Sequence, residues 1–245
     1  NSMPVAKELQ RHIGGRILPL EGDLLLSPSS QVLEVPEGEV VVWVFPIYSW
    51  GLPPVVADFI RRSKIKGAHG TGHFMVCTCG DDIGFADNQW RKLIGRRGWN
   101  PRGAFSVQMP NTYVLMKGFD VDAPEIAAAK TDAMPRRVGA VAEAIRRGFA
   151  DSDVVRGASA WLKTAVVYPF FKRFCMSPAP FRHNDKCTAC GLCAVSCPLG
   201  NISMSDGNPV WGRKCALCLR CYHICPSHAV AYGKETEGKG QKKVM

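Results

Sequence analysis

Three continuous apolar runs, rich in β-branched and aromatic residues, stand out in the first half of the chain. Runs of this kind, bounded by turn residues, predict strands that are buried on both faces of a parallel sheet. We expect these strands over residues 40–45, 73–78 and 104–109, with a shorter strand over 16–20.

Helical periodicity alternates with these strands. Val5, Leu9 and Ile13, for example, share one helical face at a spacing of four. We expect helices over residues 3–13, 54–64, 83–97 and 124–149, and a loop over 21–38. Alternating strands and helices predict an α/β fold with a doubly wound parallel sheet.

Ligands of such sheets bind beyond the carboxyl ends of the strands. The loops expected at that edge cover residues 46–53 and 78–84, and they are rich in glycine, proline, aromatic and small polar residues. A flat ring could be held between them.

A connecting segment follows over residues 151–182. Its stretch 158–175 is rich in apolar residues but is interrupted by Pro169 and carries Lys163, Lys172 and Arg173. We expect a helix packed between two domains, with a basic helix on a membrane surface as the alternative.

Two copies of the pattern C-x-x-C-x-x-C-x-x-x-C-P dominate the last third of the chain. They contain eight of the eleven cysteines: Cys187, Cys190, Cys193 and Cys197 in the first copy, and Cys215, Cys218, Cys221 and Cys225 in the second. Three thiolates at successive spacings of three can reach three irons of one cubane cluster. In two-cluster ferredoxins the fourth cysteine of each run ligates the other cluster.

This spacing predicts two [4Fe–4S] clusters with crossed ligand sets. The first set is Cys187, Cys190, Cys193 and Cys225, and the second is Cys215, Cys218, Cys221 and Cys197. A zinc site is the main rival, but zinc normally takes two separated pairs of ligands. Disulfides are a weaker rival, because closely spaced cysteines without extracellular marks more often bind metal. Cys77, Cys79 and Cys175 lie outside the runs, and we expect them to be small buried apolar residues.

The pattern around the cysteines repeats as well. The turn sequence SDGNP separates two short apolar stretches, 202–204 and 210–211, and predicts a hairpin. Residues 228–232 would supply the matching strand of the second half. The polar tail after Gly233 predicts disorder.

The formal net charge of the 245 residues is +10. Two cluster–thiolate centres would lower it to about +6. The remaining charge could steer redox partner proteins with acidic docking surfaces. The chain shows no nucleic-acid-binding module and no run apolar enough to span a membrane, so we expect neither partner and a cytoplasmic location.

Several stretches together resemble the flavodoxin–ferredoxin fusion proteins common in anaerobic bacteria: VVWVFPIYSWGLPPVVADFI, TCGDDIG, SVQMPNTYVL, the double cluster motif and VWGRKCALCLRCYHICPSHAVAYGK. The resemblance runs through nearly the whole chain. It implies a flavodoxin-like domain over residues 1–150, a helical linker over 151–182 and an α+β ferredoxin domain with two [4Fe–4S] clusters over 183–245. In that family a first strand and a glycine-rich phosphate loop precede the first helix. The resemblance therefore implies that Asn1 and Ser2 end this loop, and that the strand and most of the loop lie upstream of residue 1.

The same resemblance implies FMN as a further cofactor. Its phosphate would lie at Asn1 and Ser2, where the first helix begins. Tyr48 or Trp50 would stack on the flavin ring, within a loop that includes Pro46 and Gly51, and Thr78, Cys79 and Gly80 would line its pyrimidine edge.

The function implied is electron transfer, with single electrons passing between two clusters and FMN rather than catalysis on a specific substrate. The alternative is a function of a different class, in which the α/β domain binds no flavin and docks a ferredoxin onto a partner. A third reading is an interaction module stabilised by zinc.

Overall fold

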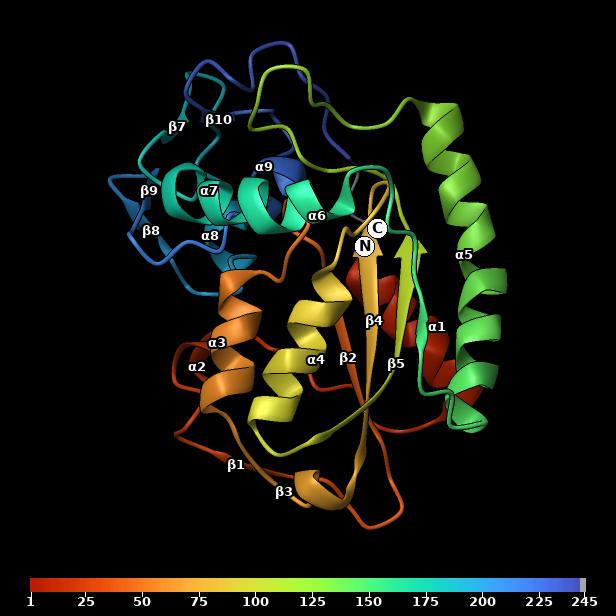
Figure 1. The fold of residues 1–245 in the computed structure, drawn as a ribbon. Helices are drawn as coiled ribbons and strands as arrows, with labels where there is room; N and C mark the ends of the chain where they lie inside the picture. Colours follow the sequence, from red (N-terminus) through yellow and green to blue (C-terminus); the bar gives the residue numbers. More distant parts are fainter. Residues whose placement is uncertain (243–245) are drawn as a thin grey trace.

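A parallel sheet lies at the centre of the larger half of the protein, as a computed structural model shows for residues 1–242 (Figure 1). Its strand order is β2-β4-β5-β6. The strands are β2 (Val41–Pro46), β4 (Gly72–Cys79), β5 (Asn100–Gln108) and β6 (Ser152–Asp153). The three expected buried strands are confirmed, and β6 adds a short strand that the sequence pattern did not indicate.

Helices cover both faces of this sheet. The helices α1 (Ser2–Ile13) and α5 (Pro124–Arg146) lie on one face, where Val5 and Val141 pack with Val76 of the central strand. On the other face, α3 (Pro54–Arg62) and α4 (Ala86–Arg96) bury Ile60 and Trp90. This is the doubly wound arrangement that the alternating pattern predicted. Both α3 and α5 begin with proline, whose fixed φ suits a first helical turn.

The segment before β2 differs from the prediction. Residues 16–20 form no strand, since Pro19 has no N–H to donate and the chain passes no partner strand there. The expected loop 21–38 contains a short helix, α2 (Gly22–Leu26), and a strand, β1 (Val32–Glu34). That strand pairs in parallel with β3 (Lys64–Lys66), which precedes a single helical turn, η1 (Ala68–Gly70).

The cysteine-rich part is built from two strand pairs and two short helices. The hairpin of β8 (Ile202–Ser205) and β9 (Asn208–Trp211) confirms the expected turn. The second pair joins β7 (Phe181–His183) to β10 (Val230–Tyr232), antiparallel. The helices α8 (Leu192–Val195) and α9 (Arg220–Ile224) each carry the third cysteine of a run.

A nearly continuous helical stretch connects the two parts. It consists of α6 (Ala160–Leu162), the wide π turns η2 (Lys163–Val167) and η3 (Phe171–Cys175), and α7 (Tyr168–Phe170) between them. Pro169 removes one helical N–H donor, and a stretch with wide turns accommodates that loss. Among the described residues, no helix combines the length and apolarity needed to cross a membrane.

The two parts share packing beyond this connection. Val114 and Leu115, from the loop between β5 and α5, lie in the core of the cysteine-rich part. On the other side of the interface, Leu199 and Ala216 join the core that α3 and α4 form on the sheet. The loops of the cluster motifs therefore lie directly against the α/β part.

The prediction of a disordered tail is wrong for residues 234–242, which form turns up to Gly238 and then follow an irregular path held by hydrogen bonds. The Lys239 ammonium donates to the carbonyls of Val114 and Met116, and the Tyr222 hydroxyl donates to the carbonyl of Lys239. A polar tail can be ordered when buried partners take up its hydrogen bonds. The last part of the predicted disorder, residues 243–245, lies outside the described residues.

Candidate iron–sulfur centres

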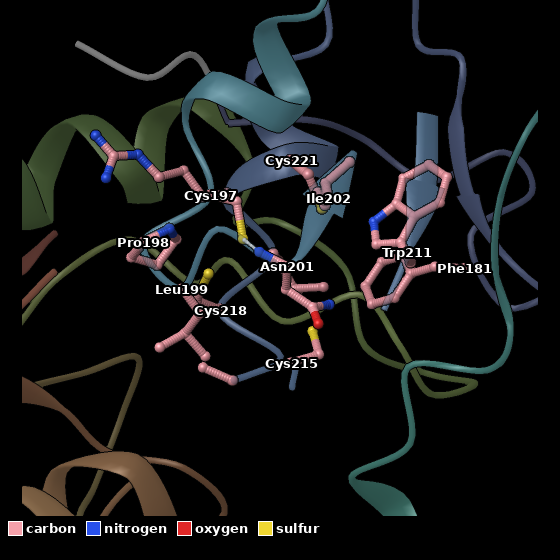
Figure 2. A pocket seen from close by; sticks show the side chains of 13 residues that line it. Phe181, Cys197, Pro198, Leu199, Asn201, Ile202, Trp211, Cys215, Cys218 and Cys221 are labelled. Carbon is pink, nitrogen blue, oxygen red and sulfur yellow. Dashed lines mark hydrogen bonds between the residues drawn. The ribbon is translucent and has the colours of Figure 1, made fainter. Parts of the chain in front are cut away.

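One pocket collects cysteines from both runs. Its walls include Cys197 of the first run together with three cysteines of the second, Cys215, Cys218 and Cys221 (Figure 2). The β8–β9 hairpin supplies another wall through Ile202 and Trp211. We call this the inner pocket, because the loops around it pack against the α/β core.

A second pocket has the reciprocal composition. It is lined by Cys187, Cys190 and Cys193 of the first run and by Cys225 of the second. We call it the outer pocket. The fold therefore brings the fourth cysteine of each run beside the first three cysteines of the other run.

The backbone of the two runs follows the same path. Ala189 and Gly191 in the first run have positive φ values of 57° and 73°, and Leu217 and Leu219 repeat them in the second run with 51° and 60°. Left-handed conformations cost a non-glycine residue about 1–2 kcal/mol, so such a loop persists only where its surroundings hold it. This conformation turns backbone N–H groups toward sulfur. The N–H of Leu217, for example, donates to Cys215 Sγ at 3.3 Å.

The fourth cysteine of each run accepts an N–H bond from the residue four positions later. Asn201 donates to Cys197 Sγ at 3.3 Å, and Ala229 donates to Cys225 Sγ at 3.2 Å. Bonds of this kind stabilise negative charge on sulfur, which a thiolate bound to a cluster carries.

Burial opposes charge on four of these thiols in the free protein. It raises the pKa of Cys193 and Cys218, that of Cys215 to about 11 and that of Cys221 to about 12. Cys225 differs: burial raises its pKa, but donors from Ser227, Ala229 and Val230 outweigh that effect and lower it. Bound iron would supply the positive charge that four neighbouring thiolates require.

Trp211 presents a buried donor at the inner pocket. Its indole Nε1–H has no hydrogen-bond partner among the described atoms, although the Nε1 atom is enclosed. The ring stacks on Phe181, with centroids 5.8 Å apart, and its N–H lies beside Cys221, where it favours the thiolate. Sequence reasoning did not single out Trp211; its position in the strand opposite Ile202 was the available signal.

The donor chemistry fits a cluster better than a single ion. Within residues 1–242, no three His, Cys, Asp or Glu side chains converge closely enough to hold one metal ion. The four thiols instead surround a pocket, which suits a cubane whose irons each bind a different thiolate.

Four of the residues that the family resemblance implies for FMN lie together at the carboxyl edge of the sheet. Pro46 pairs with Thr78 in register, and the Ser2 hydroxyl lies 2.9 Å from that of Thr78. The Asn1 side chain donates to the carbonyl of Pro110 at 2.7 Å. Gly80 lies next to this group, close to Asn111, and Cys79 is buried, with its pKa raised to about 12 by burial and then by Asp82 and Asp81.

The aromatic loop takes a different position. Tyr48 and Gly51 close a tight turn through two backbone hydrogen bonds. Burial raises the pKa of Tyr48 well above its ordinary value, and the neighbouring thiols Cys218 and Cys215 add to the effect. The loop therefore lies between the sheet edge and the inner pocket.

Protein groups already contact the side chains expected to stack on a flavin. The Lys163 ammonium lies over the Trp50 ring, 5.0 Å from its centroid, and Tyr168 packs against Gly51. Thr164 donates to the carbonyl of Trp50 at 3.0 Å. The connecting helix thus covers this loop, a contact that the sequence did not predict.

Comparison with known proteins identifies part of the chain. Residues 180–203 match the 4Fe-4S binding domain family, a segment that contains the whole first cysteine run. A 48-residue stretch is 42% identical to an uncharacterised ferredoxin from Methanocaldococcus jannaschii. That match covers 20% of this chain and 30% of the relative, so the chain spans less than a third of the curated relative it matches. These matches indicate a ferredoxin-type iron–sulfur region.

Proposed function

We propose that this protein transfers electrons through two [4Fe–4S] clusters. The inner pocket would hold one on Cys197, Cys215, Cys218 and Cys221, and the outer pocket the other on Cys187, Cys190, Cys193 and Cys225. The observation that carries the proposal is the reciprocal mixing of the two runs in two pockets. A bound cluster of this type accepts and releases one electron.

The protein's own residues would set how readily each cluster does so. Backbone donors reach Cys197, Cys215 and Cys225, and Cys221 of the inner pocket is buried. Hydrogen bonds to sulfur and burial are established determinants of cluster potential. The proposed redox partners are proteins with acidic docking surfaces, matched to the net charge of about +6 that remains when both clusters are bound.

FMN at the carboxyl edge of the sheet is the finer proposal. It is supported by the meeting of Ser2 and Thr78 at the edge where doubly wound sheets bind ligands, and by the position of Tyr48 between this edge and the inner pocket. A flavin there would exchange electrons with the inner cluster and convert between one- and two-electron partners.

The alternative is an α/β part that docks the ferredoxin without binding flavin. The packing of Lys163 on Trp50 and of Tyr168 on Gly51 favours it, since both contacts occupy the loop that would stack on the ring.

Anaerobic purification of the full protein tests these proposals together. Iron and acid-labile sulfide in equal amounts, with two reducible cluster signals by electron paramagnetic resonance, would support the clusters. Zinc without sulfide would refute them. Flavin bound after FMN reconstitution, and lost in Thr78→Val, would support the flavin site. Full cluster content without FMN binding would refute the flavin site and support the docking function of the α/β part.

A further inference from the structure

The connecting helical stretch leaves one apolar face open to solvent. The side chains on this face are exposed by 49% to 67%: Trp161, Leu162, Val166, Phe170 and Phe174. Four of them recur at intervals of four residues, so they form a single row along the helix. We call this row the 161–174 face.

The opposite side of the same stretch is packed on the α/β part. Tyr168 and Phe171 are buried, and the Tyr168 hydroxyl donates to the carbonyl of Leu52 at 2.6 Å. Thr164 fixes the start of the stretch through its hydroxyl, which donates to the carbonyl of Trp50. The stretch cannot rotate its open face inward without breaking these contacts. An apolar face that is held toward solvent in this way is typical of a surface that binds an external partner.

The charged side chains of the connecting stretch itself have one sign. No Asp or Glu occurs over residues 154–184. Arg156 and Lys163 are neutralised by Asp87 and Asp82, respectively. Lys172 and Arg173 make no ion pair within the described residues, and they lie over the rings of Tyr168 and Phe174, with 5.7 Å and 5.1 Å to the ring centroids. Two uncompensated cations thus flank the apolar row.

We propose that the 161–174 face docks the protein on an anionic lipid surface. A row of Trp, Leu, Val and Phe with adjacent Lys and Arg is the composition of helices that lie in the membrane interface. The apolar row would enter the boundary between headgroups and acyl chains, and the two cations would pair with lipid phosphates. A second copy of this chain would present the same positive charge and so lacks the complement.

Docking through the 161–174 face would require neither the clusters nor a flavin. The connecting stretch would then hold the protein at a membrane surface. The inner side of the stretch covers Trp50 and Gly51, so docking would also hold this loop at a fixed distance from the lipid.

Vesicle flotation of the full, cluster-loaded protein tests the proposal. We expect flotation with vesicles that contain phosphatidylglycerol, weaker flotation with phosphatidylcholine alone, and loss of binding as salt increases. The double variant Phe170→Ser, Phe174→Ser should lose binding. Lys172→Glu with Arg173→Glu should reduce the partition coefficient about tenfold or more, because each cation contributes to binding near an anionic surface.

Val195→Ser is the matched control. Val195 is 88% exposed and lies outside the 161–174 face, so its replacement should leave flotation unchanged. The far-ultraviolet circular dichroism and iron content of every variant should equal those of the parent protein. Failure of the parent protein to float with phosphatidylglycerol, or equal flotation of the Phe variant, would overturn the proposal. So would light scattering that shows a dimer which the Phe variant abolishes, because the face would then bind a second copy.

Discussion

The ring of Tyr168 lies so close to Gly51 that a β-carbon at this position would be 2.4 Å from ring atoms. Only a residue without a side chain allows this approach, which places the connecting stretch on the loop beside the inner pocket. The hydroxyl of the same tyrosine is satisfied by the carbonyl of Leu52. Glycine at position 51 is therefore explained by packing, since the positive φ values of this turn lie at Ser49 and Trp50.

Gly51→Ala should destabilise the protein by displacing this ring. Overpacking of a close contact costs about 1–3 kcal/mol. The free energy of unfolding, from urea titration, should fall by that amount. Gly70→Ala is the control, because a β-carbon at Gly70 meets no atom within 4 Å. Equal effects of the two substitutions would contradict the packing account.

Cys197→Ala should remove the cluster of the inner pocket and spare that of the outer pocket. Cys197 stands with the second run in space, although it belongs to the first run in sequence. Iron per chain should fall by about half, and one of two paramagnetic signals should disappear. Cys175→Ala serves as control, because Cys175 lines neither pocket. Loss of the outer-pocket signal instead would refute the crossed ligand sets.

Trp211→Phe should make the potential of the inner cluster more negative and leave the outer cluster unchanged. A reduced cluster carries one more negative charge, which an N–H donor to sulfur stabilises. Phenylalanine keeps the stacking on Phe181 but removes the donor. Redox titration monitored by paramagnetic resonance measures both potentials. Trp161→Phe, at an exposed position, is the control, and an unshifted inner potential would show that the indole N–H does not reach the cluster.

Arg156→Met should destabilise the protein strongly. Two nitrogens of Arg156 bond both oxygens of Asp87, at 2.7 and 2.8 Å, and Asp87 is fully buried. Removing the cation leaves a buried carboxylate uncompensated, at a cost of about 3–5 kcal/mol. The exposed pair Arg62–Asp58 offers a control, since Arg62→Met should change the unfolding free energy by at most about 1 kcal/mol. A smaller loss in Arg156→Met than in this control would contradict the prediction.

His73 should make stability depend on pH. Burial lowers the pKa of this imidazole, which accepts the indole N–H of Trp43 and bonds the carbonyl of Ala68, each at 3.0 Å. At pH values below 6.5, the ordinary pKa of histidine, the imidazole of the unfolded chain therefore binds a proton more readily than that of the folded chain. The free energy of unfolding should fall as pH decreases below 6.5, by at most about 1.4 kcal/mol per pH unit.

Burial also lowers the pKa of His223, which contributes in the same direction. His73→Gln should therefore remove only its own part of the slope. Urea unfolding from about pH 7.5 to about pH 5.5, followed by tryptophan fluorescence, measures this slope. An unchanged slope in His73→Gln would show that His73 titrates normally in the folded protein.

Hydrophobic periodicity was enough to place most of the elements. The strands around Trp43, Val76 and Phe105 and the helix around Trp90 lie where the pattern predicted them. The apolar runs and the helical spacing of these segments already mark the side chains that become buried. The predictions were wrong where contacts with residues distant in sequence determine the local structure. Residues 16–20 lacked a strand to pair with, and the polar tail gained partners on Tyr222 and Val114.

By itself the sequence determined which cysteines are the candidates for binding iron and how the α/β part is layered. Cysteine spacing fixes how many thiolates one loop can direct to one centre, and periodicity fixes which side chains face the core. The tertiary structure alone decided that Trp211 presents its N–H at the inner pocket, and that the connecting helix covers Trp50 and Gly51 while exposing Phe170 and Phe174. These relationships join residues far apart in the chain, and no local spacing encodes them.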